Sequence, residues 1–215
     1  MNSLYTLSMH FCLALLACAH PLPEYSGEIG LVMEDPEFQK VVSQSWSLVK
    51  KIQDDIPEVT KALIAEPKLN ALPDYKDIDL QMMAAQLGIP SAPVLKALTT
   101  EFTLETSLTR MTEGLQMFQH LLTIVRDHSV APEKLDILLA DIRDLMTQNY
   151  KVSQLAQLEI NVVQYVDSGL AARLAGEFEK RVAAHIVLAN LRAFAQDVHR
   201  SLRHMSAKSQ RAART

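Results

Sequence analysis

The sequence predicts an all-α protein, an up-up-down-down four-helix bundle with two long crossover loops. Four segments repeat apolar residues at spacings of three and four, the period of one helix face. Strand signals are nearly absent, and the one β-branched piece, 160–163, is either a loop or a short helix extension. About 30 residues separate the first and second segments, and a comparable stretch separates the third and fourth, but only about five join the second and third. Long connections let the chain cross the whole bundle, whereas a short one forces antiparallel neighbours.

The first helix is predicted from Pro36 to Ile64, because a proline favours a helix start and the apolar pattern begins there. Pro57 either kinks this helix or marks a restart. The predicted core face consists of Val42, Ser45, Val49, Ile52, Ile56 and Leu63.

The second and third helices flank the short connection. The second is predicted from about Ala97 to Val125, with a core stripe of Leu104, Leu108, Met111, Leu115, Phe118, Leu122 and Val125. The third begins after Ala131, where a proline and an acidic residue favour a helix start. It is expected to bury Leu135, Leu138, Leu139, Ile142, Leu145 and Met146.

The fourth helix has the clearest pattern, because residues 181–205 contain neither glycine nor proline. Its apolar stripe cannot be stable alone in water, so the other helices must bury it. That stripe comprises Ala184, Val187, Leu191, Phe194, Ala195, Val198, Leu202 and Met205.

The N-terminus resembles a secretory signal peptide over residues 1–19, with a short apolar run and small residues before a cut after Ala19. An uncleaved or cytosolic N-terminus is the alternative. Both cysteines, Cys12 and Cys18, lie in this segment, so a cleaved chain would have no disulfide. Residues 20–207 then form one domain, and residues 208–215 a frayed basic tail. No later segment predicts a membrane anchor, so we expect a free, secreted protein.

Composition and motifs argue against several function classes. The formal charge of −4 is modest and mixed in sign, which does not indicate nucleic-acid binding. No Glu-x-x-His pair, His-Glu-x-x-His motif or phosphate-binding glycine loop occurs, and a cleaved chain would have no thiol nucleophile. Histidines on the predicted helices are interpreted as solvent-facing or capping. We therefore expect no enzyme activity, cofactor, metal or small-molecule substrate.

Charged helix faces are the remaining candidates for function. On the third helix Asp144 is predicted to point away from the core and Asp141 to the side, which gives an acidic outer stripe. On the first helix the outer face is formed in the same way by Lys50 and Lys51 with Ser47 and Asp54. Each face is either a solvated surface or a binding surface, and the pattern alone does not distinguish the two.

Five segments in order resemble the granulocyte colony-stimulating factor family. Residues 48–53 resemble its first-helix Val-Arg-Lys-Ile-Gln segment, and residues 87–93 read Leu-Gly-Ile-Pro-Ser-Ala-Pro where the family has Leu-Gly-Ile-Pro-Trp-Ala-Pro. Residues 114–122 are similar to its second-helix Gly-Leu-x-x-Tyr-Gln-x-Leu-Leu pattern. Residues 135–144 resemble its third helix, and the fourth helix, including 202–204, resembles its last.

The resemblance implies a monomeric ligand of a class I cytokine receptor that acts on myeloid cells through receptor-associated kinases. The family's major receptor site lies on the first and third helices. Carried over to matching positions, that site comprises Lys50, Lys51, Asp55, Asp141, Asp144 and Thr147.

Some positions depart from the family. Its important first-helix glutamate falls at Ser47, which cannot form an ion pair. An acid in the first crossover, used for a second receptor contact, is placed at Asp79. The family's disulfides are missing, so the crossover is either mobile or held by a short helix that packs Leu80, Met82, Met83 and Leu87.

Two alternatives stay open at the level of sequence. One is another interleukin-six-type cytokine. The other, from a different class, is a secreted amphipathic-helix lipid-binding protein. Lipid-binding helices tend to repeat in proline-bounded units, whereas these differ in length and do not repeat.

Overall fold

The computed structural model describes residues 32–64, 77–95, 102–160 and 169–212. Within these ranges every regular element is a helix, so the all-α prediction is confirmed. The long helices are α3 (Pro36–Ile64), α5 (Leu104–Asp127), α6 (Pro132–Leu155) and α8 (Glu177–Ala212). Two shorter ones, α4 (Asp77–Leu87) and α7 (Leu170–Arg173), lie in the connections.

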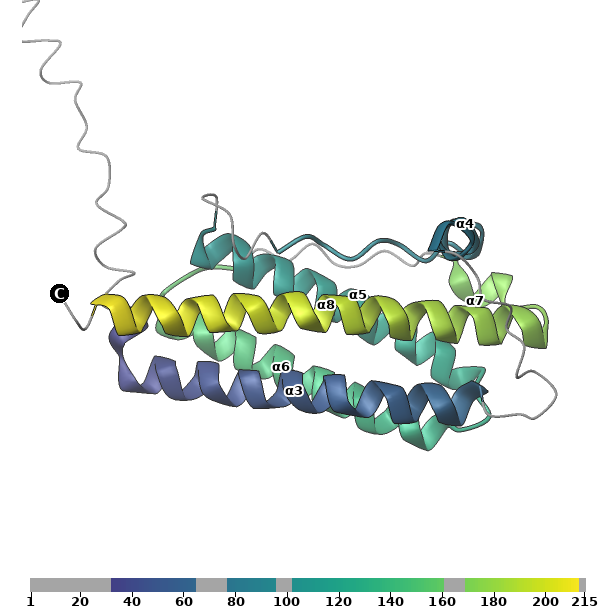
Figure 1. The fold of residues 1–215 in the computed structure, drawn as a ribbon, viewed down its shortest axis with the longest axis horizontal. Helices are drawn as coiled ribbons and strands as arrows, with labels where there is room; N and C mark the ends of the chain where they lie inside the picture. The colour runs from purple at the N-terminus through teal and green to yellow at the C-terminus, as the bar shows by residue number, and fades with distance from the viewer. Residues whose placement is uncertain (1–31, 65–76, 96–101, 161–168, 213–215) are drawn as a thin grey trace, which may run out of the picture.

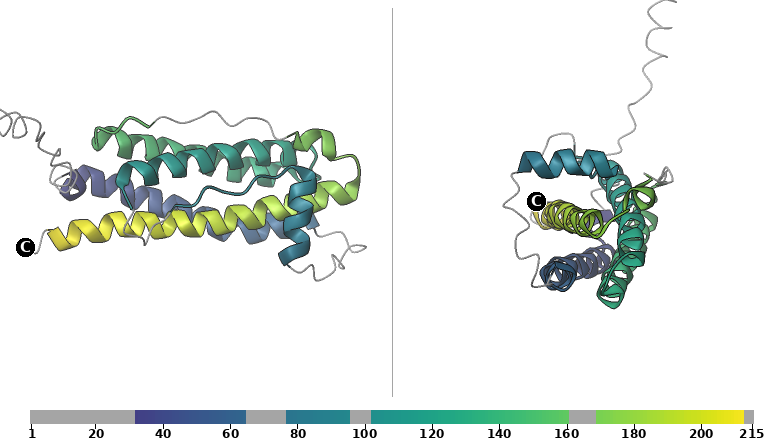
Figure 2. Two further views of the ribbon diagram at one scale, coloured as in Figure 1. Left: turned by 90° about the horizontal axis from the view of Figure 1, so that it is seen from above. Right: turned by 90° about the vertical axis from the view of Figure 1, so that its right-hand side faces the viewer.

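The four long helices form the predicted up-up-down-down bundle. In Figure 1, α3 and α5 run in one direction and α6 and α8 return in the other. Helix α3 packs against α6 and α8, and α5 packs against the same two, so α3 and α5 are diagonal to each other (Figure 2). The connections from α3 to α5 and from α6 to α8 must therefore cross the length of the bundle.

The core consists of the stripes predicted from sequence. All the apolar positions predicted for α3, α5 and α8 are buried, as is Ser45. On α6 the prediction is confirmed except that Met146 is only partly buried. These stripes bury one another, so the predicted apolar faces of the long helices are used within the bundle core.

Helix boundaries differ from the prediction at two ends. Helix α5 begins at Leu104 rather than Ala97, because Thr103 has an extended backbone and its side chain accepts a hydrogen bond from the Thr106 amide at 3.1 Å. Helix α8 continues to Ala212, so the backbone of 208–212 is helical where a frayed tail was predicted. Pro57 neither ends nor restarts α3, which is continuous through it.

A short helix in the first crossover packs across α8 near one end of the bundle (Figure 2). This is α4, and Gly88 ends it with a left-handed φ of 72° while the Ile89 amide donates to the Ala84 carbonyl at 2.8 Å. Leu87 is buried, as predicted. The prediction for Met82 was wrong: it is 57% exposed, because it lies on the outer side of α4.

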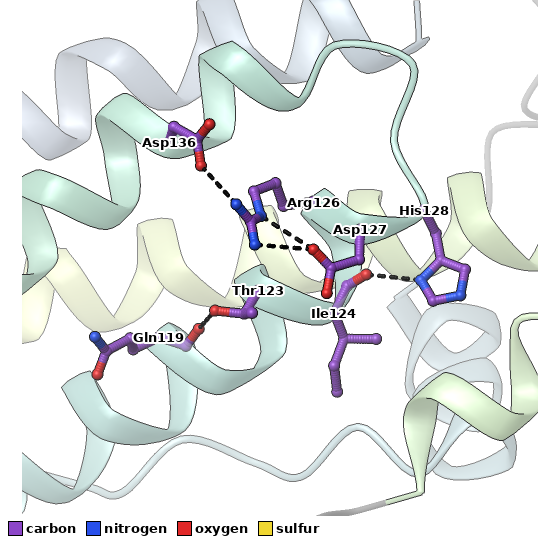
Figure 3. Close-up of polar contacts among 7 residues, drawn as sticks. All are labelled: Gln119, Thr123, Ile124, Arg126, Asp127, His128 and Asp136. Carbon is purple, nitrogen blue, oxygen red and sulfur yellow. Dashed lines mark hydrogen bonds and ion pairs between the residues drawn. The ribbon is translucent and has the colours of Figure 1, made fainter.

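The short turn between α5 and α6 is held by local polar contacts (Figure 3). Arg126 at the end of α5 bridges to Asp136 on α6 at 3.2 Å, and the His128 ring contacts the Ile124 carbonyl at 2.9 Å. Further along, buried Asn149 on α6 donates to the Leu108 carbonyl of α5 at 2.9 Å. These contacts fix two antiparallel neighbours.

Several sequence predictions lie outside the described residues. They are the signal peptide over 1–19, the part of the β-branched piece after Ile160, and the last residues of the basic tail.

Replacement of Gly114 by alanine should destabilise the bundle. A Cβ at this position of α5 would overlap the ring of Phe194 on α8. The clash should cost roughly 1–3 kcal/mol, more than the approximately 1 kcal/mol that alanine gains in helix propensity. Chemical denaturation should show the loss, and it should shrink or reverse in a Phe194→Leu background, where the ring is absent. A stabilising Gly114→Ala in the parent chain would contradict this close packing.

Candidate functional site

A charged cluster joins α3 to α6 along one edge of the bundle. The Lys51 ammonium of α3 donates to both carboxylate oxygens of Asp141 on α6, each at 2.6 Å. The same ammonium lies 3.9 Å from Asp55, one turn further along α3. Because α3 and α6 are packed together, two residues 90 positions apart in the chain meet here.

The two partners of this ion pair differ in exposure. Asp141 is only 6% exposed, whereas the Lys51 side chain is 51% exposed. Asp141 therefore needs its partner, since a nearly buried carboxylate without a hydrogen bond is costly. The expected outer stripe is corrected in this respect: Asp141 faces α3 and is covered by it.

Asp144 and Thr147 are exposed on the solvent side of α6. The Thr147 hydroxyl donates to the Arg143 carbonyl at 3.0 Å, so its proton is used within the helix. Asp144 forms no hydrogen bond or ion pair with another described residue, which leaves its carboxylate open to a ligand.

The hydrogen bond to Asp141 is the main cause of a raised pKa at Lys51, above the ordinary value of 10.5. The charges of Asp141, Asp55 and Asp144 act in the same direction, and partial burial opposes them. Lys51 thus stays charged well above neutral pH. Its single positive charge balances only part of the negative charge of Asp141, Asp55 and Asp144, so this group of residues keeps a net negative charge.

The two neighbouring lysines of α3, Lys50 and Lys51, lie at different edges of the bundle. Lys51 faces α6, but Lys50 lies over the Trp46 ring, 6.0 Å from its centroid, and Trp46 contacts His199 on α8. The structure therefore does not bring Lys50 together with Asp141. Consecutive residues are 100° apart on a helix, and α3 lies between α6 and α8, so Lys50 and Lys51 point toward different helices.

Asp79 lies apart from the α3–α6 edge, and Ser47 lies on the same side of α3 as Lys51 but carries no charge. Asp79 belongs to α4, which packs on α8, and its side chain is outside the described part of the chain. Ser47 is exposed and its hydroxyl donates to the Ser43 carbonyl at 3.1 Å, so it offers no charge.

Sequence reasoning missed an apolar residue on this surface. Ile137 is 51% exposed and lies two helical turns before Asp144, on the same face of α6. It sits in a run with Leu135, Leu138 and Leu139, all buried, so its apolar character alone gives no sign of exposure. The sequence did contain one sign of its exposure, which is that it lies two helical turns before Asp144 and so on the same side of the helix.

Other kinds of site find little support in the described residues. No group of three or more His, Cys, Asp or Glu side chains there could hold a metal ion. None of the helices in this part of the chain is long and apolar enough to cross a membrane. One cavity, of about 210 Å³, lies between the ends of α3 and α5 and the start of α8, and both polar and apolar residues line it, including Val125, His128 and Lys180.

An up-up-down-down bundle with two long crossovers is the architecture of a long-chain helical cytokine. Residues 49–203 match the family model for granulocyte colony-stimulating factor. The chain is similar to human granulocyte colony-stimulating factor, 27% identical over 161 residues, which cover 74% of this chain and 75% of the human protein. The pig and cat proteins of that name are also 27% identical over 161 residues, and the match covers 78% of the length of each.

The chain belongs to the granulocyte colony-stimulating factor family. It is therefore a cytokine of the growth-factor type, and this family is not a family of enzymes.

Substitution of Lys51 by glutamine should destabilise the protein in a pH-dependent way. At neutral pH the loss should be about 1 kcal/mol, since a partly exposed charged hydrogen bond disappears. The raised pKa means that the contribution of Lys51 is complete below pH 10.5 and is lost as pH rises through the higher folded-state value. Thermal unfolding between neutral pH and pH 11 would measure this.

The control is Lys134→Gln, which removes an exposed lysine of α6 that has no described ion pair. The difference in melting temperature between Lys51→Gln and the parent should narrow above pH 10.5, while that of Lys134→Gln stays small throughout. A constant difference across the range would refute the assigned role of the ion pair.

Proposed function

We propose that this protein is a secreted ligand of a class I cytokine receptor of the granulocyte colony-stimulating factor type. It stimulates proliferation and differentiation of myeloid cells through receptor-associated kinases. The observation that carries the proposal is the family match over residues 49–203, which reaches from the middle of α3 into α8. The protein acts as a monomer when free, and residues 1–19 direct its secretion.

The main receptor contact is proposed on the α3–α6 edge. Asp144 supplies an exposed carboxylate, and Ile137 and Thr147 lie on the same side of α6. An apolar side chain beside a charged one suits an interface in which burial gives affinity and charge gives register and a faster encounter. A receptor loop with a basic side chain is the complementary partner.

Residues of the ion-pair cluster have a different part in the proposal. The Lys51–Asp141 pair holds α3 and α6 in a fixed relation, so it positions the contact, and Asp55 extends the acidic surface along α3. Lys50 lies at the border, because it faces α8. A rigid, pre-arranged surface loses less entropy on binding.

A second receptor contact is proposed at Asp79 of α4. Helix α4 packs on α8, away from the α3–α6 edge (Figure 2). Two contacts on separate sides of the bundle would allow one ligand to join two receptor chains.

Loss of the Asp144 carboxylate should weaken receptor binding much more than folding. Asp144→Ala should reduce affinity for a receptor ectodomain of this type by roughly tenfold, about 1.4 kcal/mol, with an unchanged melting temperature. Surface plasmon resonance at two salt concentrations would measure it, and the loss should be larger at low salt.

The matched control is Asp136→Ala, which removes an exposed aspartate of the same helix that faces Arg126 of α5. It should leave affinity within about twofold, since its carboxylate is already paired with Arg126 and is not free to meet a receptor side chain. Equal affinities for the Asp144 variant and the parent, with both folded, would place the receptor contact elsewhere.

Cells expressing the granulocyte colony-stimulating factor receptor should respond to the purified protein with phosphorylation of the downstream transcription factors. Cells expressing a related interleukin-six-type receptor, and cells without receptor, serve as comparisons. A response only through the interleukin-six-type receptor would assign the chain to that alternative signalling partner.

A further inference from the structure

An exposed tryptophan marks the opposite edge of α3, where this helix meets α8. Trp46, the only tryptophan of the chain, is 39% exposed. Its ring lies 5.3 Å from the His199 ring of α8, measured between centroids, and the Lys50 ammonium lies 6.0 Å from its centroid. A large aromatic side chain left at the surface beside cations is a feature of binding surfaces.

The Trp46–His199 contact fixes which side of α8 faces this edge. Arg192 and Arg203 are seven residues before and four residues after His199, so they lie on the same side of the helix, and both are exposed. The row from Arg192 to Arg203 is about 16 Å long at the rise of an α-helix. We refer to Trp46, Lys50, Arg192, His199 and Arg203 together as the Trp46 surface.

The cations of the Trp46 surface have no acidic partners in the described part of the chain. Neither Lys50, Arg192 nor Arg203 makes an ion pair there, in contrast to Lys51 with Asp141 and Arg200 with Asp197. Neighbouring positions on the same side of each helix carry no carboxylate. These positions are Gln39, Ser43 and Gln53 on α3, beside Trp46 and Lys50, and Gln196 on α8, between Arg192 and Arg203. The exposed Asp54 borders the surface, nearer the outer side of α3.

We propose that the Trp46 surface binds a sulfated polysaccharide. The chain has a formal net charge of −4, so attraction of a polyanion cannot come from the overall charge and must arise from a local group of unpaired cations. A row of arginines along a straight helix matches an extended chain of sulfate groups, and guanidinium groups bind such oxyanions through paired hydrogen bonds. The exposed part of the Trp46 side chain offers an apolar surface against which a sugar ring can pack.

This proposal goes beyond the receptor function and does not depend on it. The Trp46 surface lies on the α8 side of α3 and the receptor surface on the α6 side. An acidic protein partner would be attracted by the same cations. Binding to a polysaccharide in the absence of any other protein distinguishes the two kinds of ligand.

Arg192→Gln/Arg203→Gln should weaken binding to heparin about fivefold and lower the salt concentration at which the full-length protein elutes from a heparin column, since two exposed charge contacts are lost. The control is Arg143→Gln/Lys151→Gln, which removes two exposed, unpaired cations of α6. It should elute close to the parent. Equal elution of all three proteins, or no retention of the parent, would overturn the proposal.

Trp46 fluorescence supplies a second readout that is specific to this surface, because there is no other tryptophan. Heparin should change the Trp46 emission of the parent, and unsulfated hyaluronan should not. A third variant, Lys208→Gln/Arg211→Gln/Arg214→Gln, tests the C-terminal basic residues. If heparin bound without a change in Trp46 emission, and only this third variant lost binding, the polysaccharide site would be the C-terminus and the proposal would be wrong.

Discussion

Burial of the apolar stripe of α8 governs how the other helices pack. Helix α8 contacts α3, α5 and α4, and its apolar side chains from Val182 to Met205 are covered by them. No cysteine lies within the described residues, so burial, rather than disulfides, holds these helices together. Close packing against α8 also explains why α5 carries a glycine at position 114, where a larger residue would meet Phe194.

The Lys51–Asp141 pair shows how a charged side chain can serve the fold rather than a partner. Asp141 is nearly buried and satisfied within the molecule, whereas Asp144, three residues later, is exposed and has no such contact. The two acids look equivalent in the sequence. Their surroundings give them different chemistry: one ties two helices together, and the other is available for recognition.

Helix α3 separates two surfaces of opposite character. On its α6 side three carboxylates surround one lysine, and on its α8 side unpaired cations surround an exposed tryptophan. The modest net charge of the chain is therefore unevenly distributed, with acidic groups on one side of α3 and basic groups on the other. Such segregation allows one small bundle to present chemically different faces to different partners.

The four helices, their core faces and the order of long and short connections could be predicted from the amino-acid sequence, because apolar periodicity and proline placement are local signals. The family resemblance carried by residues 87–93 and 114–122 was also readable there. Packing between helices settled which side chains stay exposed: Asp141 is covered by α3, the apolar Ile137 is not buried, and Lys50 and Lys51 face different helices. The physical reason is that exposure depends on the neighbouring helix, which periodicity along one segment does not specify.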